Sequence, residues 1–85
     1  MTLNDLKPGQ KATVKNIQSQ GALRRHIIDM GITPGVIVMM RKRAPFGDPI
    51  EINVRGYELS IRKSEALQII VNKCKEGENA SNRKI

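Results

Sequence analysis

The chain contains few of the residues on which enzymes and metal sites depend. Its 85 residues include one His, one Cys, one Phe, one Tyr and no Trp. Because Cys74 is the sole cysteine, no disulfide can form within the chain. His26 and Cys74 are also too few for a structural zinc site or for a ferrous site built from two His and a carboxylate. The sequence therefore predicts no metal-ligand set and no intrinsic cofactor.

Signals of catalysis and of membrane insertion are missing as well. His26 falls on an expected helix and Cys74 in a polar tail, so no base stands beside a nucleophile. Neither Gly-x-x-x-x-Gly-Lys-Ser/Thr nor Gly-x-Gly-x-x-Gly occurs. No apolar run approaches the ~20 residues that a membrane span needs, and Met1 to Asp5 do not resemble a signal peptide. We expect a cytoplasmic, non-enzymatic protein with no small-molecule substrate and no membrane insertion.

Positive charge is abundant. The chain carries 15 Lys and Arg against 8 Asp and Glu, a net charge of +7. This balance either serves solubility or favours an acidic partner, such as nucleic acid, anionic lipid or an acidic protein face. The cations at 41–43, at Arg55 and at 62–63 are candidates for a basic patch. Phe46 and Tyr57 form a thin platform for base stacking, however, so nucleic-acid binding is disfavoured.

The hydrophobic pattern predicts a mainly β domain. Residues 11–17, 50–54, 57–62 and 67–71 show the alternation or apolar content typical of strands. The unbroken apolar run at 36–40 predicts a further strand that is covered on both faces. Five short strands with tight turns and one inserted helix indicate a small SH3-like five-stranded barrel.

The helix is expected at about 20–30, with Ser19 as its cap and Gly31 at its end. A short helical turn is expected near 63–66, capped by Ser64. Thr33 to Val36 fits a type II turn, and Arg55-Gly56 fits a tight hairpin turn. Residues 1–72 would form one domain, followed by a disordered polar tail at 73–85. The predicted core is Leu6, Val14, Leu23, Ile27, Val36, Val38, Ile52, Val54, Leu59, Ile61, Leu67 and Ile69.

Two segments are candidates for binding a protein partner. On the helix, Ile28 lies off the apolar stripe and beside Arg24, which suits an interface anchor; alternatively it tucks under a loop or is a lone exposed residue. In the stiff loop between Pro45 and Pro49, Phe46 is a natural anchor unless it packs back onto the barrel. The candidate contacts are Arg24, Ile27, Ile28, Phe46 and Asp48, with Ile27 also placed in the core.

Seven short segments, in their order and spacing, resemble the FeoA family, the small cytosolic component of bacterial ferrous iron uptake. The resemblance spans about residues 2–71, and the chain is also similar to the SH3-like C-terminal domain of iron-dependent repressors. The matching segments are Leu6–Gly9, Ala22–Arg25, Asp29–Gly31, Thr33–Gly35, Ala44–Ile50, Val54–Tyr57 and Leu59–Arg62.

The resemblance implies an SH3-like accessory protein that binds and regulates FeoB, a membrane permease with a cytoplasmic GTP-hydrolysing domain. Such a protein would be recruited to the inner face of the membrane by its partner. Two alternatives stay open: a transition-metal-associated regulatory domain that pairs with a separate DNA-binding chain, and a small basic nucleic-acid-binding module. A weak association with ferrous ion through His26 or Cys74 also stays open.

The predicted core yields a first test at Ile52, which should point inward from the middle of a strand. We expect Ile52→Ala to lower the free energy of unfolding by about 2–5 kcal/mol, because it leaves a cavity in a small core. Urea denaturation measures this loss. A loss below about 1 kcal/mol would contradict the inward placement.

Overall fold

The structure is a computed structural model and describes residues 1–73. The predicted disordered tail lies, apart from Lys73, outside the described residues. The helical elements are η1 (Leu3–Asp5), α1 (Gly21–Asp29) and α2 (Lys63–Ala66). The strands are β1 (Lys11–Ile17), β2 (Ile37–Arg43), β3 (Ile50–Val54), β4 (Tyr57–Ile61) and β5 (Ile69–Lys73).

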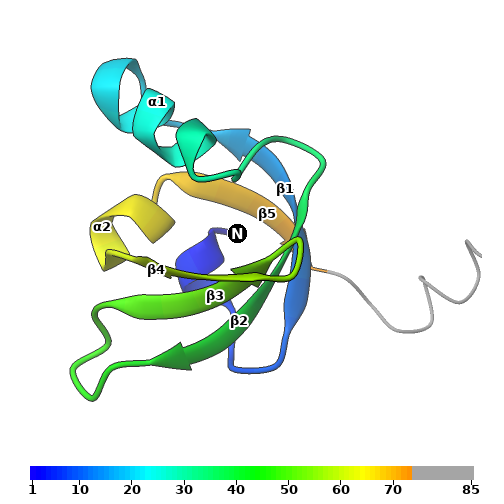
Figure 1. The fold of residues 1–85 in the computed structure, drawn as a ribbon, viewed down its shortest axis with the longest axis vertical. Coiled ribbons are helices and arrows are strands. Elements are labelled where there is room, and N and C mark those ends of the chain that lie inside the picture. Colours follow the sequence, from blue (N-terminus) through cyan, green and yellow to red (C-terminus); the bar gives the residue numbers. More distant parts are fainter. Residues whose placement is uncertain (74–85) are drawn as a thin grey trace, which may run out of the picture.

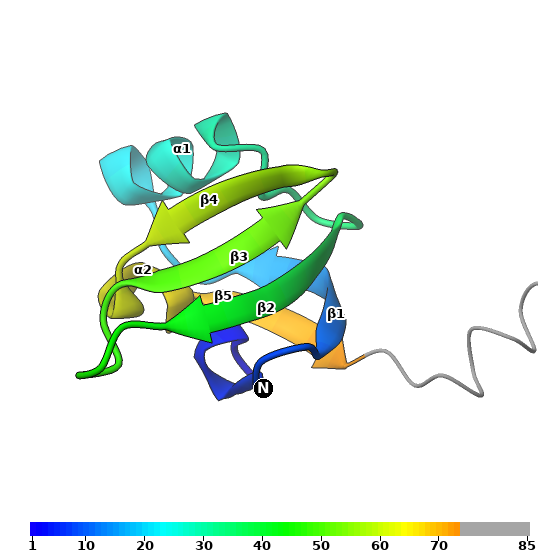
Figure 2. The same ribbon diagram turned by 60° about the horizontal axis from the view of Figure 1, so that its bottom comes forward.

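The strands form a single five-stranded antiparallel sheet in the order β4-β3-β2-β1-β5. The sheet curls, so that β2, β3 and β4 lie side by side in front of β1 and β5 (Figure 2). Helix α1, inserted between β1 and β2, lies at one end of the molecule (Figure 1). The prediction of a mainly β fold with five strands, one inserted helix and a short helical turn is confirmed. Within residues 1–73, no helix is both long and apolar enough to cross a membrane.

The core is aliphatic and lies inside the curled sheet. Ile52 is fully buried, as predicted, and Leu23 and Leu59 pack against the core while half-buried. Leu67 was predicted to be a core residue, which is wrong, because its exposed fraction is 42%. The buried hydrophobic residues are Leu3, Leu6, Ala12, Val14, Ile17, Ile27, Ile32, Val36, Val38, Met40, Ile50, Ile52, Val54, Ile61, Ala66, Ile69 and Val71.

Two β-bulges interrupt the simple alternation of buried and exposed residues. In β1 the register shifts between Val14 and Asn16, and in β2 it shifts between Met40 and Lys42. An extra residue in one strand moves every later side chain to the opposite face. Ile17 is therefore buried beyond the first bulge, and Arg43, paired with buried Ile50, lies on the inner side beyond the second.

The prediction that the 36–40 run is covered on both faces is wrong. Val38 and Met40 are fully buried, but Ile37 is 52% exposed and Met39 is half-buried. Helix α1 does not cover the outer face of β2, so that face stays open to solvent. The apolar run therefore marks a strand with one core face and one exposed apolar face.

Helix α1 ends in a Schellman motif. Gly31 adopts the predicted left-handed conformation (φ 97°), and its N–H donates to Ile28 O at 2.9 Å. The N–H of Ile32 donates to Ile27 O at 3.3 Å, and both side chains are fully buried. At the other end Gln20, rather than the predicted Ser19, is the N-cap residue, and no side chain caps it.

The start of α2 also differs from its prediction. Arg62, not Ser64, is the N-cap residue, and its N–H donates to Glu65 Oε1 at 2.8 Å. Leu67 follows as the C-cap residue with helical backbone angles (φ −67°, ψ −18°). Strand β5 therefore begins at Ile69 instead of Leu67, which leaves Leu67 outside the alternation and exposed.

Arg43 fastens the N-terminal segment to the barrel. Its Nη1 donates to Asn4 Oδ1 at 3.0 Å, and its Nη2 donates to Asn4 O and, at 3.1 Å, to Leu6 O. The segment so held carries Leu3 and Leu6, which are both buried in the core. Arg43, one of the cations of the expected basic patch, is therefore half-buried and engaged within the chain.

We expect Arg43→Met to lower the free energy of unfolding by about 1–3 kcal/mol, because it leaves partly buried carbonyl groups without their charged donor. Arg41→Met is the matched control on the same strand: Arg41 forms an exposed ion pair with Glu58, and losing such a pair costs about 0–1 kcal/mol. Urea denaturation of both variants provides the comparison. Equal losses would show that Arg43 does not fasten the N-terminal segment.

Candidate partner-binding surfaces

On α1, the candidate residues divide between surface and core. Ile28 is half-buried and packs against the core, and together with Gly21, Arg24 and Arg25 it lines a shallow hollow of about 290 Å³. Arg24 Nη1 donates to Ile17 O at 3.0 Å, which ties the helix to the end of β1. Ile27 is fully buried, so it belongs to the core and offers no contact to a partner. Arg24 and Ile28 remain as the surface candidates on this helix.

His26 links α1 to α2, a role that its sequence position did not suggest. Its Nε2 lies 3.2 Å from Glu65 Oε2, and the exposed fractions of the two side chains are 58% and 12%. The imidazole is thus largely exposed to solvent and yet has a carboxylate partner. No local spacing signals a contact between residues this far apart in the chain.

The loop between β2 and β3 presents Phe46 to solvent. Phe46 is 97% exposed, so it does not pack back onto the barrel. The loop beneath it is held by hydrogen bonds from Gly47 N to Ala44 O at 2.7 Å and from Ala44 N to Pro49 O at 3.0 Å. Asp48 is exposed, and its Oδ1 accepts a hydrogen bond from the N–H of Lys63 at 2.9 Å. The loop is therefore anchored to the first residue of α2.

The two candidate surfaces lie apart. Helix α1 stands at the top of the molecule and the β2–β3 loop at its bottom in both views (Figures 1 and 2). The structure thus brings Arg24 together with Ile28, and Phe46 together with Asp48, but does not unite the two pairs in one patch.

Within the predicted basic patch of 41–43, Arg55 and 62–63, two of the cations at 41–43 face carboxylates. Arg41 Nε lies 3.2 Å from Glu58 Oε2, and Lys42 Nζ lies 4.0 Å from Glu51 Oε1. Arg43 is engaged with the N-terminal segment. Tyr57 is 73% exposed. These pairings reduce the free positive charge on this part of the sheet.

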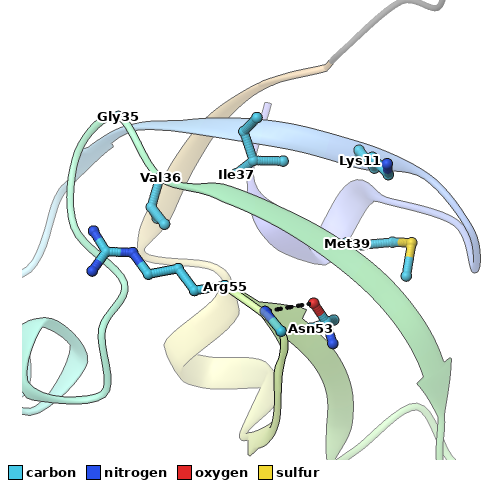
Figure 3. A pocket seen from close by; sticks show the side chains of 8 residues that line it. Lys11, Gly35, Val36, Ile37, Met39, Asn53 and Arg55 are labelled. Atoms are coloured by element: carbon cyan, nitrogen blue, oxygen red, sulfur yellow. Dashed lines mark hydrogen bonds between the residues drawn. The ribbon is translucent and has the colours of Figure 1, made fainter.

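Sequence reasoning missed a third surface, a groove on the outer face of the sheet (Figure 3). The groove encloses about 580 Å³ between β2 and the β3–β4 turn. Its apolar part is exposed Ile37 with half-buried Met39. The sequence did contain a sign of this groove, because the 36–40 run is apolar at every position. In the structure no helix covers Ile37 and Met39, the residues of this run that face outward. The lining residues are Lys11, Gly35, Val36, Ile37, Met39, Asn53, Arg55 and Gly56.

No ligand set for a metal ion is present within residues 1–73. No three His, Cys, Asp or Glu side chains in this part of the chain gather into a group that could hold one. His26 and Glu65 supply one nitrogen and one carboxylate, fewer ligands than the metal sites of proteins use. Cys74 lies outside the described residues.

Solved structures with similar sequences share this fold. A FeoA-like protein from Clostridium acetobutylicum is 42% identical, with a TM-score of 0.83, over 89% of this chain and 88% of its own. FeoA from Stenotrophomonas maltophilia, described as an SH3 domain protein and solved with zinc, is 29% identical, with a TM-score of 0.75, over 85% of this chain and 89% of its own. The predicted SH3-like architecture is therefore confirmed.

The fold is also found in metal-dependent repressors. The manganese regulator SloR matches 87% of this chain and 34% of its own length, at 19% identity and a TM-score of 0.75. A likeness at this level of identity establishes the fold alone. The resemblance to the SH3-like domain of such repressors is confirmed in that sense.

A curated relative and a family model complete the comparison. A fusion protein of Porphyromonas gingivalis, described as Fe(2+) transport protein A joined to Fe(2+) transporter FeoB, is 30% identical over 71 residues. That match covers 84% of this chain and 8% of the fusion protein, so the chain spans less than a tenth of this relative. The model of the FeoA domain matches residues 1–73, which is every residue that the structure describes. The chain therefore belongs to the FeoA family.

Proposed function

We propose that this protein is a non-enzymatic accessory component of ferrous iron uptake that binds the cytoplasmic part of a FeoB-type, GTP-dependent permease and regulates it. The observation that carries the proposal is the fusion protein, in which a segment 30% identical to this chain is joined to the transporter FeoB. Covalent linkage keeps two domains at a high effective concentration. A separate chain needs a specific docking surface to achieve the same association.

The β2–β3 loop supports this proposal as the main contact. Phe46 projects into solvent, while Asp48 and the hydrogen bonds below the tip hold the loop in place. A constrained loop loses little conformational freedom when it binds, and a buried aromatic side chain is a common interface anchor. Binding through Phe46 thus removes a large exposed apolar side chain from water.

Helix α1 supplies the second contact in this proposal. Ile28 and the exposed Arg25 line its shallow hollow, with Arg24 alongside. An apolar residue flanked by cations suits an acidic protein face with an apolar centre. Because the helix and the loop stand at opposite ends of the barrel, a partner that touches both must reach around the domain.

The alternative of a small basic nucleic-acid-binding module has less support than the FeoB-binding role. Three of the six cations in the expected basic patch, Arg41, Lys42 and Arg43, are engaged by other groups of the chain. Phe46 and Tyr57 are the only aromatic side chains in the sequence. Proteins that hold single strands combine a cationic groove with stacked aromatics. The alternative of a metal-associated regulatory domain rests only on the fold that this chain shares with the manganese regulator SloR.

We expect Phe46→Ala to weaken binding to the purified cytoplasmic part of FeoB by about 1 kcal/mol or more, roughly fivefold in Kd, because it removes the anchor. Isothermal titration calorimetry measures the affinity, with and without a GTP analogue. Far-ultraviolet circular dichroism checks that the variant stays folded.

Tyr57→Ala is the matched control, because it removes the other aromatic side chain, which is 73% exposed on β4. Its affinity should equal that of the unchanged protein. If Phe46→Ala binds as tightly as this control, the loop is not the contact. If the unchanged protein does not bind the cytoplasmic part of FeoB at all, the proposed function is wrong.

A further inference from the structure

The groove on the outer face of the sheet combines apolar surface with two cations, Lys11 and Arg55, that form no ion pair within residues 1–73. On this face Met39 is flanked by its cross-strand partners, Lys11 on β1 and Asn53 on β3. Ile37 lies two residues before Met39 on β2, opposite Thr13 of β1. The exposed side chain of Ile37 and the half-buried side chain of Met39 thus form a short apolar strip.

The carboxylates of the neighbouring strands do not neutralise the cations at the groove. Glu58 lies 3.2 Å from Arg41 Nε, and it accepts a further hydrogen bond from Asn53 Nδ2 at 3.2 Å. Glu51 lies 4.0 Å from Lys42 Nζ. Among residues 1–73, no Asp or Glu forms an ion pair with Lys11 or Arg55. These two cations therefore remain available to a ligand.

The backbone at Arg55 is unusual for a charged residue. The β3–β4 turn places Arg55 at φ 53° and Gly56 at φ 86°, and Gly56 N donates to Asn53 Oδ1 at 3.3 Å. Two positive φ angles define the turn type that prefers Asn-Gly. Arg at its first position carries a conformational cost, yet it places the guanidinium group beside the groove (Figure 3).

We propose that this groove is a docking site for a peptide segment that carries an apolar side chain between carboxylates. The apolar side chain packs on Ile37 and Met39, and the carboxylates pair with Lys11 and Arg55. Charge complementarity selects this occupant, because the free charges at the groove are positive and its floor is apolar. The groove has no aromatic lining for base stacking, which favours a peptide over a nucleic acid. The proposal is independent of the docking on FeoB described above.

The test uses the full chain, labelled with ¹⁵N, and a fluorescein-labelled peptide of sequence Asp-Glu-Leu-Leu-Glu-Asp. We expect saturable binding with amide shifts concentrated at Lys11, Ile37, Met39 and Arg55. A peptide in which both leucines are replaced by serine has the same charge and should bind about threefold more weakly or worse. Equal binding of the two peptides would reduce the site to non-specific charge attraction and overturn the proposal.

Two variants separate binding from folding. Arg55→Asn removes the cation at a turn position that favours Asn, so it should weaken peptide binding about threefold while leaving the midpoint of urea denaturation unchanged or higher. Ile37→Thr removes part of the strip and keeps a β-branched residue in the strand, with a similar weakening expected. Lys63→Gln and Leu67→Gln are the matched controls, because they remove an exposed cation and an exposed apolar side chain from α2 and its end.

Other results contradict the proposal. Amide shifts confined to α1 or to the β2–β3 loop would show that the peptide binds there and not in the groove. Losses of affinity as large in the two control variants as in the two groove variants would show that the groove does not bind the peptide. A single-stranded oligouridine that displaces the peptide and shifts the same amides at lower concentration would assign the groove to nucleic acid. Phe46→Ala should leave peptide binding unchanged, so failure here and failure of the FeoB contact are distinguishable.

Discussion

The barrel depends on the hydrogen bonds by which Arg43 holds the N-terminal segment against the sheet. The bulge in β2 turns Arg43 to the inner side, where its guanidinium group reaches Asn4 and the carbonyl of Leu6. That segment contributes Leu3 and Leu6, both buried, to the core. In a domain this small, the hydrophobic core leaves little margin of stability. The extra residue in β2 thus brings Arg43 to the position from which it holds the N-terminal segment.

Much of this architecture could be predicted from strand alternation and from the residues that end helices and form turns. The predictions that proved wrong have physical causes. Alternation placed Ile52 and Val54 inward, and the conformational needs of Gly31 and of the Arg55-Gly56 turn located a helix end and a hairpin. The bulges at β1 and β2 were not predictable from alternation, because they depend on pairing between distant strands. Ile32 was predictable in principle, since the second residue beyond the helix end packs back onto the helix in a Schellman motif.

The candidate surfaces were less accessible to sequence reasoning than the fold. The loop rich in proline marked Phe46 as an anchor but left open whether it packs back onto the barrel, and nothing in the sequence predicted the hydrogen bond that the N–H of Lys63 donates to Asp48. Ile28 was located by its angle on the helix, whereas its neighbour Ile27 was assigned both to the core and to the surface and proved to be buried. The outer groove escaped notice because an unbroken apolar run suggested cover on both faces. The absence of that cover is what makes the strand a candidate for recognition.

Helix α2, only four residues long, supports both ends of the molecule. Its first amide is bonded to Asp48 below the loop tip, and its Glu65 is paired with His26 on the inserted helix. Helix α2 therefore contacts the loop on one side and α1 on the other. Two surfaces at opposite ends of the barrel are thus linked through a single turn of helix, by one backbone hydrogen bond and one imidazole–carboxylate contact.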